Sequence, residues 1–175
     1  MNHNKKKQQV NDWYHSFSDD IYQYIFFMIK DHNQAMDLMQ DTFLRAFDSC
    51  STFEGVNAKG WIFRIARNLT IDSIRKNKPI SYFFDTAQPI FAKGVSPEHS
   101  VTLSETQREL YTALGKIKVS YRDVIILRKI EGFSITEAAT ILDWNESKVR
   151  TTLSRGMKAL RKQLEKEGYK HEAIR

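Results

Sequence analysis

The prolines of this 175-residue chain are confined to one short stretch, because Pro79, Pro89 and Pro97 lie within nineteen consecutive residues. Proline lacks a backbone N–H and biases the residue before it away from helix, so no long helix can cross this stretch. On both sides of it, strand patterns are scarce and helix signals are many. We therefore predict an all-α fold of two small helical domains, residues 11–78 and 105–168, joined by a proline-containing linker over 79–104.

Four pairs of residues have the spacing of helix N-terminal caps, in which a side chain accepts the backbone N–H three residues later. The pairs are Asp31 with Gln34, Ser104 with Gln107, Ser120 with Asp123, and Ser134 with Glu137. Together with the apolar periodicity they predict helices at about 11–30, 32–50, 60–78, 105–117, 121–131, 135–142 and 146–167. The aromatic residues of the linker either pack on the flanking domains or line a path through a partner; they are Tyr82, Phe83, Phe84 and Phe91.

Composition excludes several classes of protein. A single cysteine, Cys50, rules out an intramolecular disulfide framework, and the polar residues that follow the first lysines do not form a secretory signal. The longest apolar run, Ile25–Ile29, is far shorter than the roughly 20 residues that span a bilayer. The histidines show no metal-ligand spacing, and no glycine-rich phosphate loop occurs. We therefore expect a cytoplasmic protein without direct membrane insertion, catalytic residues, metal or cofactor.

Charge is separated along the chain. Residues 11–60 hold three Lys or Arg against eight Asp or Glu, whereas residues 61–78 hold five against one and residues 145–168 hold seven against three. The whole chain carries a formal net charge of +6. A protein that needed only solubility would mix its signs. The separation favours a function in which a protein partner and a nucleic acid are held at once.

The acidic part contains a predicted amphipathic helix over residues 35–48. At 100° per residue its apolar side chains form one broad face, and Asp37, Gln40, Asp41, Arg45 and Asp48 form the other. Leu44 lies among these polar residues, which favours a protein contact surface. The alternative is a solvated polar face with one exposed leucine, which is common on protein surfaces.

The first basic helix has an outward strip of Arg64, Asn68, Ile71 and Arg75, with Arg67 beside it. A loop bracketed by Phe53 and Trp61 precedes it. Cations for phosphates and ring faces for unstacked bases are what single-stranded nucleic acid requires, and Asn68 could hydrogen-bond a base edge. The alternative is that the aromatic residues belong to the core and the arginines are solvated.

The second basic helix follows a short capped helix over 134–142 and a tight turn, Asp143-Trp144-Asn145. A short helix, a turn and a longer basic helix form the helix-turn-helix arrangement, whose second helix reads bases in the major groove. The residues placed to meet base edges are Ser147, Lys148, Arg150, Thr151, Ser154 and Arg155, and Lys158, Arg161 and Lys162 suit phosphates. Gly156 permits close packing of this helix. The alternative is an ordinary helical hairpin with a wet basic face.

The segments taken together resemble a bacterial extracytoplasmic-function sigma factor over roughly residues 12–165. Asp37–Phe43 is similar to the D-x-x-Q-[ED]-x-F core-binding motif of that family, and Trp61–Asn68 followed by Asp72 is similar to its promoter-melting helix. Tyr121–Arg128 and Glu137-Ala138-Ala139 resemble its second domain. The family often has proline at the position of Lys118 and glycine at that of Ser147, and the latter difference falls where bases would be read.

The resemblance implies a set of partners and site residues. Core RNA polymerase would be bound through the clamp helices of its largest subunit, contacting Asp37, Gln40, Asp41, Leu44 and Asp48, and through the flap of its second-largest subunit. The minus-ten promoter element would be melted at Phe53, Asn57, Lys59, Trp61, Arg64, Arg67, Asn68 and Arg75, with a flipped base held in the loop of residues 53–60. The minus-thirty-five element would be read in duplex form by Ser147, Lys148, Arg150, Thr151, Ser154, Arg155 and Lys158.

The same resemblance implies a linker that threads the polymerase toward the RNA exit channel. It also implies an anti-sigma factor, membrane-linked, that covers the same acidic and basic faces. The alternative function is a stand-alone helix-turn-helix transcriptional regulator, which would bind duplex DNA without polymerase and would leave the acidic motif unexplained.

Overall fold

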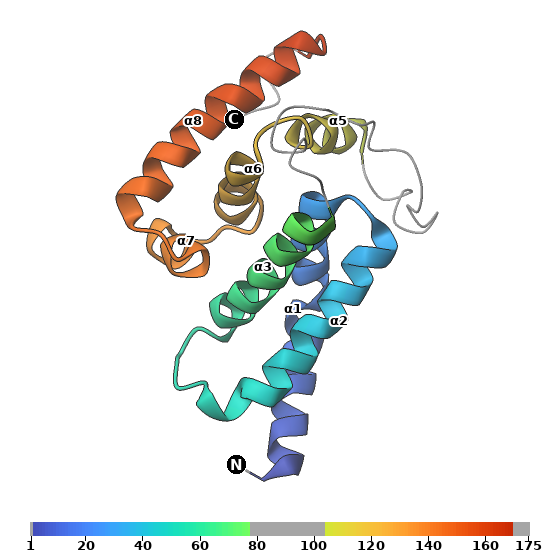
Figure 1. Ribbon diagram of the computed structural model, residues 1–175, viewed down its shortest axis with the longest axis vertical. Coiled ribbons are helices and arrows are strands. Elements are labelled where there is room, and N and C mark those ends of the chain that lie inside the picture. Colours follow the sequence, from blue (N-terminus) through green and yellow to red (C-terminus); the bar gives the residue numbers. More distant parts are fainter. Residues whose placement is uncertain (1, 78–103, 170–175) are drawn as a thin grey trace.

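The computed structural model describes residues 2–77 and 104–169, and every regular element in these two ranges is helical (Figure 1). The proposed linker lies outside the described residues except for Ser104, and so do its aromatic residues. The all-α prediction is confirmed for the described part of the chain.

The first domain is built from three helices: α1 (His3–Ile29), α2 (His32–Ser49) and α3 (Ala58–Asn77), with a short 3-10 turn, η1 (Cys50–Thr52), after α2. Asp31 caps α2 as predicted, because its Oδ1 accepts the Gln34 N–H at 2.9 Å. The apolar face predicted for α2 is also confirmed, with five buried residues: Ala35, Met39, Thr42, Phe43 and Ala46.

The start of α1 differs from the prediction by eight residues. Asn2 caps it, and the helix continues through the polar segment that precedes Val10, the first buried apolar residue. The apolar pattern of the sequence begins only at Val10, so it carried no signal for the first two turns. An edge contact between His3 and Phe47, with ring centroids 5.6 Å apart, joins these turns to α2.

The second domain consists of α5 (Glu105–Leu114), α6 (Val119–Ile125), the π-helical segment η3 (Ile126–Ile130), α7 (Ile135–Leu142) and α8 (Glu146–Lys166). The capping boxes at Ser104 and Ser134 are both formed, as predicted. The predicted cap of Ser120 on Asp123 is wrong: α6 begins earlier, its N-cap is Lys118, and the carboxylate of Asp123 is buried.

Gly156 on α8 lies where α8 crosses α6. A Cβ at this position would lie 3.2 Å from the Cδ1 of Ile125 and 3.2 Å from the Cβ of Tyr121. This confirms that the glycine permits close packing, since contacts this short force neighbouring atoms to move.

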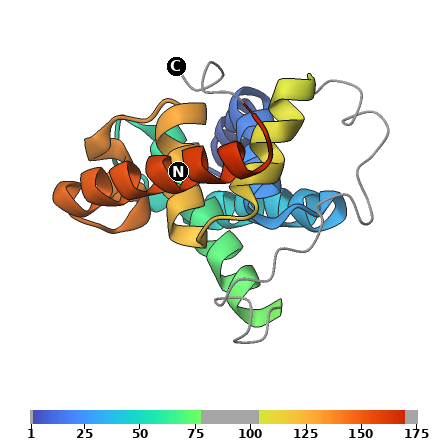
Figure 2. The same ribbon diagram turned by 90° about the horizontal axis from the view of Figure 1, so that it is seen from above.

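The two domains pack directly against each other. Phe63 of α3 meets Phe133, just before α7, with ring centroids 4.8 Å apart, and Phe26 of α1 stacks on Tyr111 of α5 at 5.1 Å. Figure 2 shows the same adjacency of α5 and the end of α1 from above. Buried residues of both domains form one continuous hydrophobic cluster. The sequence predicted two domains and a linker but gave no indication of this shared core.

Arg122 closes the polar side of this junction. Its side chain is 1% exposed, and it donates to the carbonyl of Met28 at 2.7 Å and to that of Leu114 at 2.9 Å. A cation at the C-terminal end of α1 interacts favourably with the helix dipole, and it also satisfies carbonyls that the helix leaves without partners.

We expect Gly156→Val to lower the free energy of unfolding by about 1–3 kcal/mol, because the new side chain overpacks the crossing of α6 and α8. Urea unfolding followed by circular dichroism measures this change. The matched control is Ser154→Val on the exposed side of the same helix, which we expect to alter stability much less. Equal losses in the two variants would contradict the close approach of α6 and α8.

Candidate nucleic-acid and protein interfaces

The basic face of α8 is held by a well-defined turn. Asp143 adopts a left-handed conformation with φ of 56°, and Asn145 then caps α8 by accepting the Lys148 N–H at 2.8 Å. The hydroxyl of Thr136 on α7 donates to Glu146 at 2.8 Å, which ties the two helices together. The geometry of a helix-turn-helix is therefore formed, as the sequence predicted.

All the residues predicted to meet the minus-thirty-five element are exposed on α8: Ser147, Lys148, Arg150, Thr151, Ser154, Arg155 and Lys158. Two of them are steadied by neighbours. The ammonium of Lys148 lies 4.2 Å from the ring centroid of Trp144, and Arg150 donates to Glu146 at 3.0 Å. Exposed pairs of this kind contribute little to stability, so these cations remain free to exchange partners.

The polar face of α2 is exposed, with Asp37, Gln40 and Asp48 in solvent and Asp41 half-buried. Asp41 pairs with Arg45 at 3.6 Å on this surface. Leu44 is 65% exposed, which is high for a large aliphatic side chain. The observed exposure is that of a contact surface rather than of a face turned into the core.

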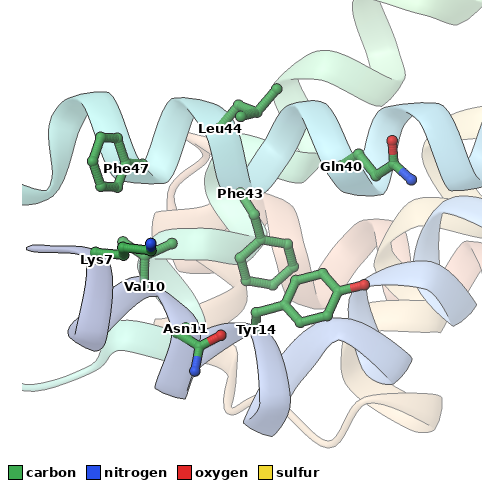
Figure 3. A pocket seen from close by; sticks show the side chains of 8 residues that line it. All are labelled: Lys7, Val10, Asn11, Tyr14, Gln40, Phe43, Leu44 and Phe47. Atoms are coloured by element: carbon green, nitrogen blue, oxygen red, sulfur yellow. The ribbon is translucent and has the colours of Figure 1, made fainter.

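A groove of about 410 Å³ lies beside this face, between α1 and α2 (Figure 3). Tyr14 and Leu44, two of the three large hydrophobic residues that are exposed in the described ranges, both line it. The full lining is Lys7, Val10, Asn11, Tyr14, Gln40, Phe43, Leu44 and Phe47. Sequence reasoning missed the part contributed by α1, because the first turns of that helix were not predicted.

The outward strip of α3 is formed as predicted. Arg64, Asn68 and Arg75 are exposed, while Ile71 between them is half-buried. These side chains are available to a ligand, and two of them are cations suited to phosphates.

The aromatic residues of the neighbouring loop are engaged in packing. Phe53 and Trp61 are half-buried against Trp13 of α1, with ring centroids 5.4 and 5.7 Å from it. Asn57 ends the loop by accepting the Gly60 N–H at 2.9 Å. Edge-to-face contacts of this kind stabilise the loop beyond the area that they bury. The rings therefore shape the loop from below, which is the packing role that the sequence left open for them.

Three of the predicted minus-ten residues are held by other side chains. Arg67 donates from Nε to Asp123 of α6 at 3.1 Å, Asn57 donates to Glu137 of α7 at 3.1 Å, and Lys59 pairs with Asp20 at 2.9 Å. The predicted site is thus divided between an open strip on α3 and an edge that faces the second domain.

Asp123 is fully enclosed at that edge. Its Oδ1 accepts the hydroxyl of Tyr24 at 2.8 Å, while its Oδ2 accepts Arg67. Burial raises the pKa of Asp123, and the Arg67 guanidinium opposes that rise. Burial also raises the pKa of Tyr24, followed by the neighbouring Asp123 carboxylate. Tyr24 therefore serves as a neutral donor, and the carboxylate depends on it and on Arg67 for its partners.

Glu131, at the end of η3, lies close to the same junction. Burial raises its pKa from 4.5 to about 7, the carboxylate of Asp20 on α1 adds to the rise, and Lys59 on α3 opposes it. Its Oε1 is buried without a hydrogen-bond partner among the described residues, as is Nε of Arg128 on its own segment. An ionised Glu131 is therefore poorly accommodated.

Within residues 2–77 and 104–169, no cluster of His, Cys, Asp and Glu could hold a metal ion. Over the same ranges no helix has the length and apolar character to cross a membrane.

Comparisons with known families divide the chain in the same way as the helices do. The model of Sigma-70 region 2 matches residues 13–80, and the model of Sigma-70 region 4 matches residues 107–160.

Among curated proteins, the ECF RNA polymerase sigma factor SigX of Bacillus subtilis is 41% identical, with 87% of this chain and 81% of SigX covered. The sigma factor SigW of the same species is 37% identical, with 85% and 84% covered.

Two solved structures share the fold at lower identity. The sigma factor RpoE of Bartonella quintana, solved in complex with the anti-sigma factor NepR, gives a TM-score of 0.69 at 23% identity, with 90% of this chain and 98% of that chain covered. CnrH, solved in complex with the cytosolic domain of CnrY, gives 0.68 at 22% identity, with 91% and 89% covered.

We expect the stability of the protein to fall as pH rises through about 7, with a share that belongs to Glu131. Because its pKa is about 7 in the folded chain and near 4.5 when exposed, the folded state keeps a proton that the unfolded state has released between these values. Raising the pH through this window therefore favours unfolding, and below about 4.5 the effect of this group disappears.

Urea unfolding of the wild type and of Glu131→Gln at several pH values between about 5 and 8 isolates this share. The fall should be smaller in Glu131→Gln, which carries no proton to lose. Glu54→Gln, on an exposed loop, is the control. A pH dependence that is the same in Glu131→Gln and in the wild type would show that Glu131 titrates normally.

Proposed function

The chain belongs to the extracytoplasmic-function RNA polymerase sigma factors, which direct promoter recognition and transcription initiation, and we propose how its surfaces divide this work. The observation that carries the proposal is the separation of one acidic face and two basic faces onto three different helices, all largely exposed. The α2 face binds core polymerase, the α3 strip binds melted minus-ten DNA, and α8 reads the minus-thirty-five duplex.

The polymerase-binding surface consists of the acidic face of α2 and the groove beside it. The occupant that we propose is the pair of clamp helices of the largest polymerase subunit. Cationic side chains of that partner would meet Asp37, Asp41 and Asp48, and an apolar side chain would enter the groove next to Leu44. Complementary charge gives such an interface its register, and the buried apolar contact at its centre gives affinity.

The minus-ten element is bound as single strand along α3. Arg64 and Arg75 are placed for phosphates, and Asn68 between them for a base edge. A flipped base would occupy the loop of residues 53–60, which Asn57 shapes through its contact with Gly60. Unstacking a base costs only a few kcal/mol, so captured bases suffice to hold the promoter open. This function requires no bond chemistry, and we propose that the chain acts without catalytic residues or cofactor.

The minus-thirty-five element is read in duplex form by the exposed residues at the start of α8. The second domain would also bind the flap of the second-largest polymerase subunit. Both nucleic acid and polymerase place the protein in the cytoplasm. An anti-sigma factor, membrane-linked, would compete for the acidic and basic faces; the co-crystallised partners of RpoE and CnrH support this class of partner.

Run-off transcription from genomic fragments tests the proposed function. Purified bacterial core polymerase is used with and without the protein, and the 5′ ends of the RNA are mapped. We expect discrete new starts that share two upstream elements. Absence of new starts, together with tight binding of duplex DNA by the protein alone, would instead support a stand-alone helix-turn-helix regulator.

We expect Asp41→Arg to weaken binding to core polymerase about tenfold or more, equivalent to ~1.4 kcal/mol, because it reverses a charge at the centre of the α2 face. Affinity is measured by fluorescence anisotropy of the labelled protein, with circular dichroism confirming the helical fold. Asp19→Arg, an equal reversal at an exposed position of α1, is the control and should leave affinity nearly unchanged. Equal affinities for the two variants would place the polymerase contact elsewhere.

We expect Arg150→Ala to lose about 1–3 kcal/mol of discrimination for the minus-thirty-five sequence over random duplex, because a base-edge contact is removed. Lys158→Ala should instead weaken binding to both duplexes alike, as a phosphate contact does. The measurement is holoenzyme binding to duplexes that differ only in that element. Uniform weakening by Arg150→Ala would reassign Arg150 to the phosphate backbone.

A further inference from the structure

The edge of the minus-ten site that faces the second domain is occupied by carboxylates of that domain. Arg67 retains 17% exposure of its side chain and donates to the buried carboxylate of Asp123. On the same side, Asn57 of the capture loop donates to Glu137 of α7. A guanidinium and an amide that would face an anionic strand thus face two carboxylates, which present acceptor oxygens as phosphates do.

The contact is specific rather than incidental. Both printed hydrogen bonds of the Asp123 carboxylate come from the first domain, one from Tyr24 and one from Arg67. A carboxylate that is 1% exposed needs such partners, so its burial is compensated by the first domain. The phenylalanine contact between Phe63 and Phe133 lies beside it and excludes water from the junction.

The rest of the proposed DNA and polymerase surfaces stays open in this arrangement. Arg64, Asn68 and Arg75 are exposed on α3, and so are Asp37, Gln40 and Leu44 on α2. In Figure 1, α7 lies against the part of α3 nearest its beginning, away from α2. Core polymerase can therefore contact α2 while the second domain still covers Arg67 and Asn57.

We propose that the second domain inhibits promoter melting from within, with Asp123 and Glu137 holding Arg67 and the capture loop until the two domains separate. This inference rests on the proposed role of α3 in binding the minus-ten strand. Its consequence is an order of events in which polymerase binds the closed protein, the domains separate, and only then do Arg67 and Asn57 become available to DNA.

The test uses variants that weaken this inhibitory contact without changing a DNA-binding residue. Tyr24→Phe removes one hydrogen bond from Asp123 on the first-domain side, and Asp123→Asn weakens the contact from the other side. Tyr22→Phe is the matched control, since its hydroxyl bonds to His32 within the first domain at 2.7 Å. The probe is a fluorescein-labelled, single-stranded non-template oligonucleotide spanning the minus-ten element of a promoter mapped by run-off transcription.

We expect Tyr24→Phe and Asp123→Asn to bind this oligonucleotide about tenfold more tightly than the wild type, as the loss of a hydrogen bond to a charged group allows. Tyr22→Phe should bind like the wild type. If Asp123→Asn fails to fold, Tyr24→Phe alone decides the matter.

The separation itself is measured between spin labels at exposed positions of the two domains, Gln23 on α1 and Thr140 on α7. We expect one short distance in the free wild type, a longer population in Tyr24→Phe, and a long distance when core polymerase is added. Unchanged oligonucleotide affinity in a variant whose labels have moved apart, or a short distance retained in holoenzyme that transcribes, would overturn the inference. Absence of transcription in the run-off assay would instead overturn the proposed function.

Discussion

The arrangement of the two domains depends on a single buried carboxylate. Asp123 is 1% exposed, and its partners Tyr24 and Arg67 come from the other domain. Removing a carboxylate from water costs several kcal/mol, and the attraction of one guanidinium offsets this only when the remaining acceptor positions are also satisfied. The hydroxyl of Tyr24 satisfies them. The closed form therefore exists because three side chains meet, and loss of any one leaves a buried polar group without its partner.

The same helices serve both the fold and the binding surfaces, because each helix divides cleanly around its circumference. On α2, buried residues such as Met39 and Phe43 alternate with exposed ones such as Asp37 and Leu44 at helical spacing. On α3, Ile62 and Ala66 face the core while Arg64 and Asn68 face solvent. The third direction of α3, which carries Phe63 and Arg67, faces the second domain. A helix with three such faces cannot present its whole polar surface while that domain is in place.

Sequence reasoning recovered what depends on local spacing. The capping boxes at Ser104 and Ser134, the turn at Asp143 and the exposed face of α8 all follow from residues within four positions of one another. It failed where partners lie far apart in the chain. Asp123 was predicted as a local cap, yet its hydroxyl partner Tyr24 is 99 residues away, and the burial of Phe63 depends on Phe133 in the other domain. The first turns of α1 were missed because they precede the apolar pattern.

The junction between the domains is not built for maximal stability. Beside the satisfied Asp123 lies Glu131, whose Oε1 has no hydrogen-bond partner among the described residues and whose neighbour Asp20 repels it. Lys59 is shared between these two carboxylates, with its ion pair made to Asp20. An interface selected only to hold two domains together would replace Glu131 by an apolar residue, since a buried charge without partners opposes folding. One carboxylate that favours closure and another that opposes it leave the two states closer in free energy, which is the condition under which a binding partner can shift their populations.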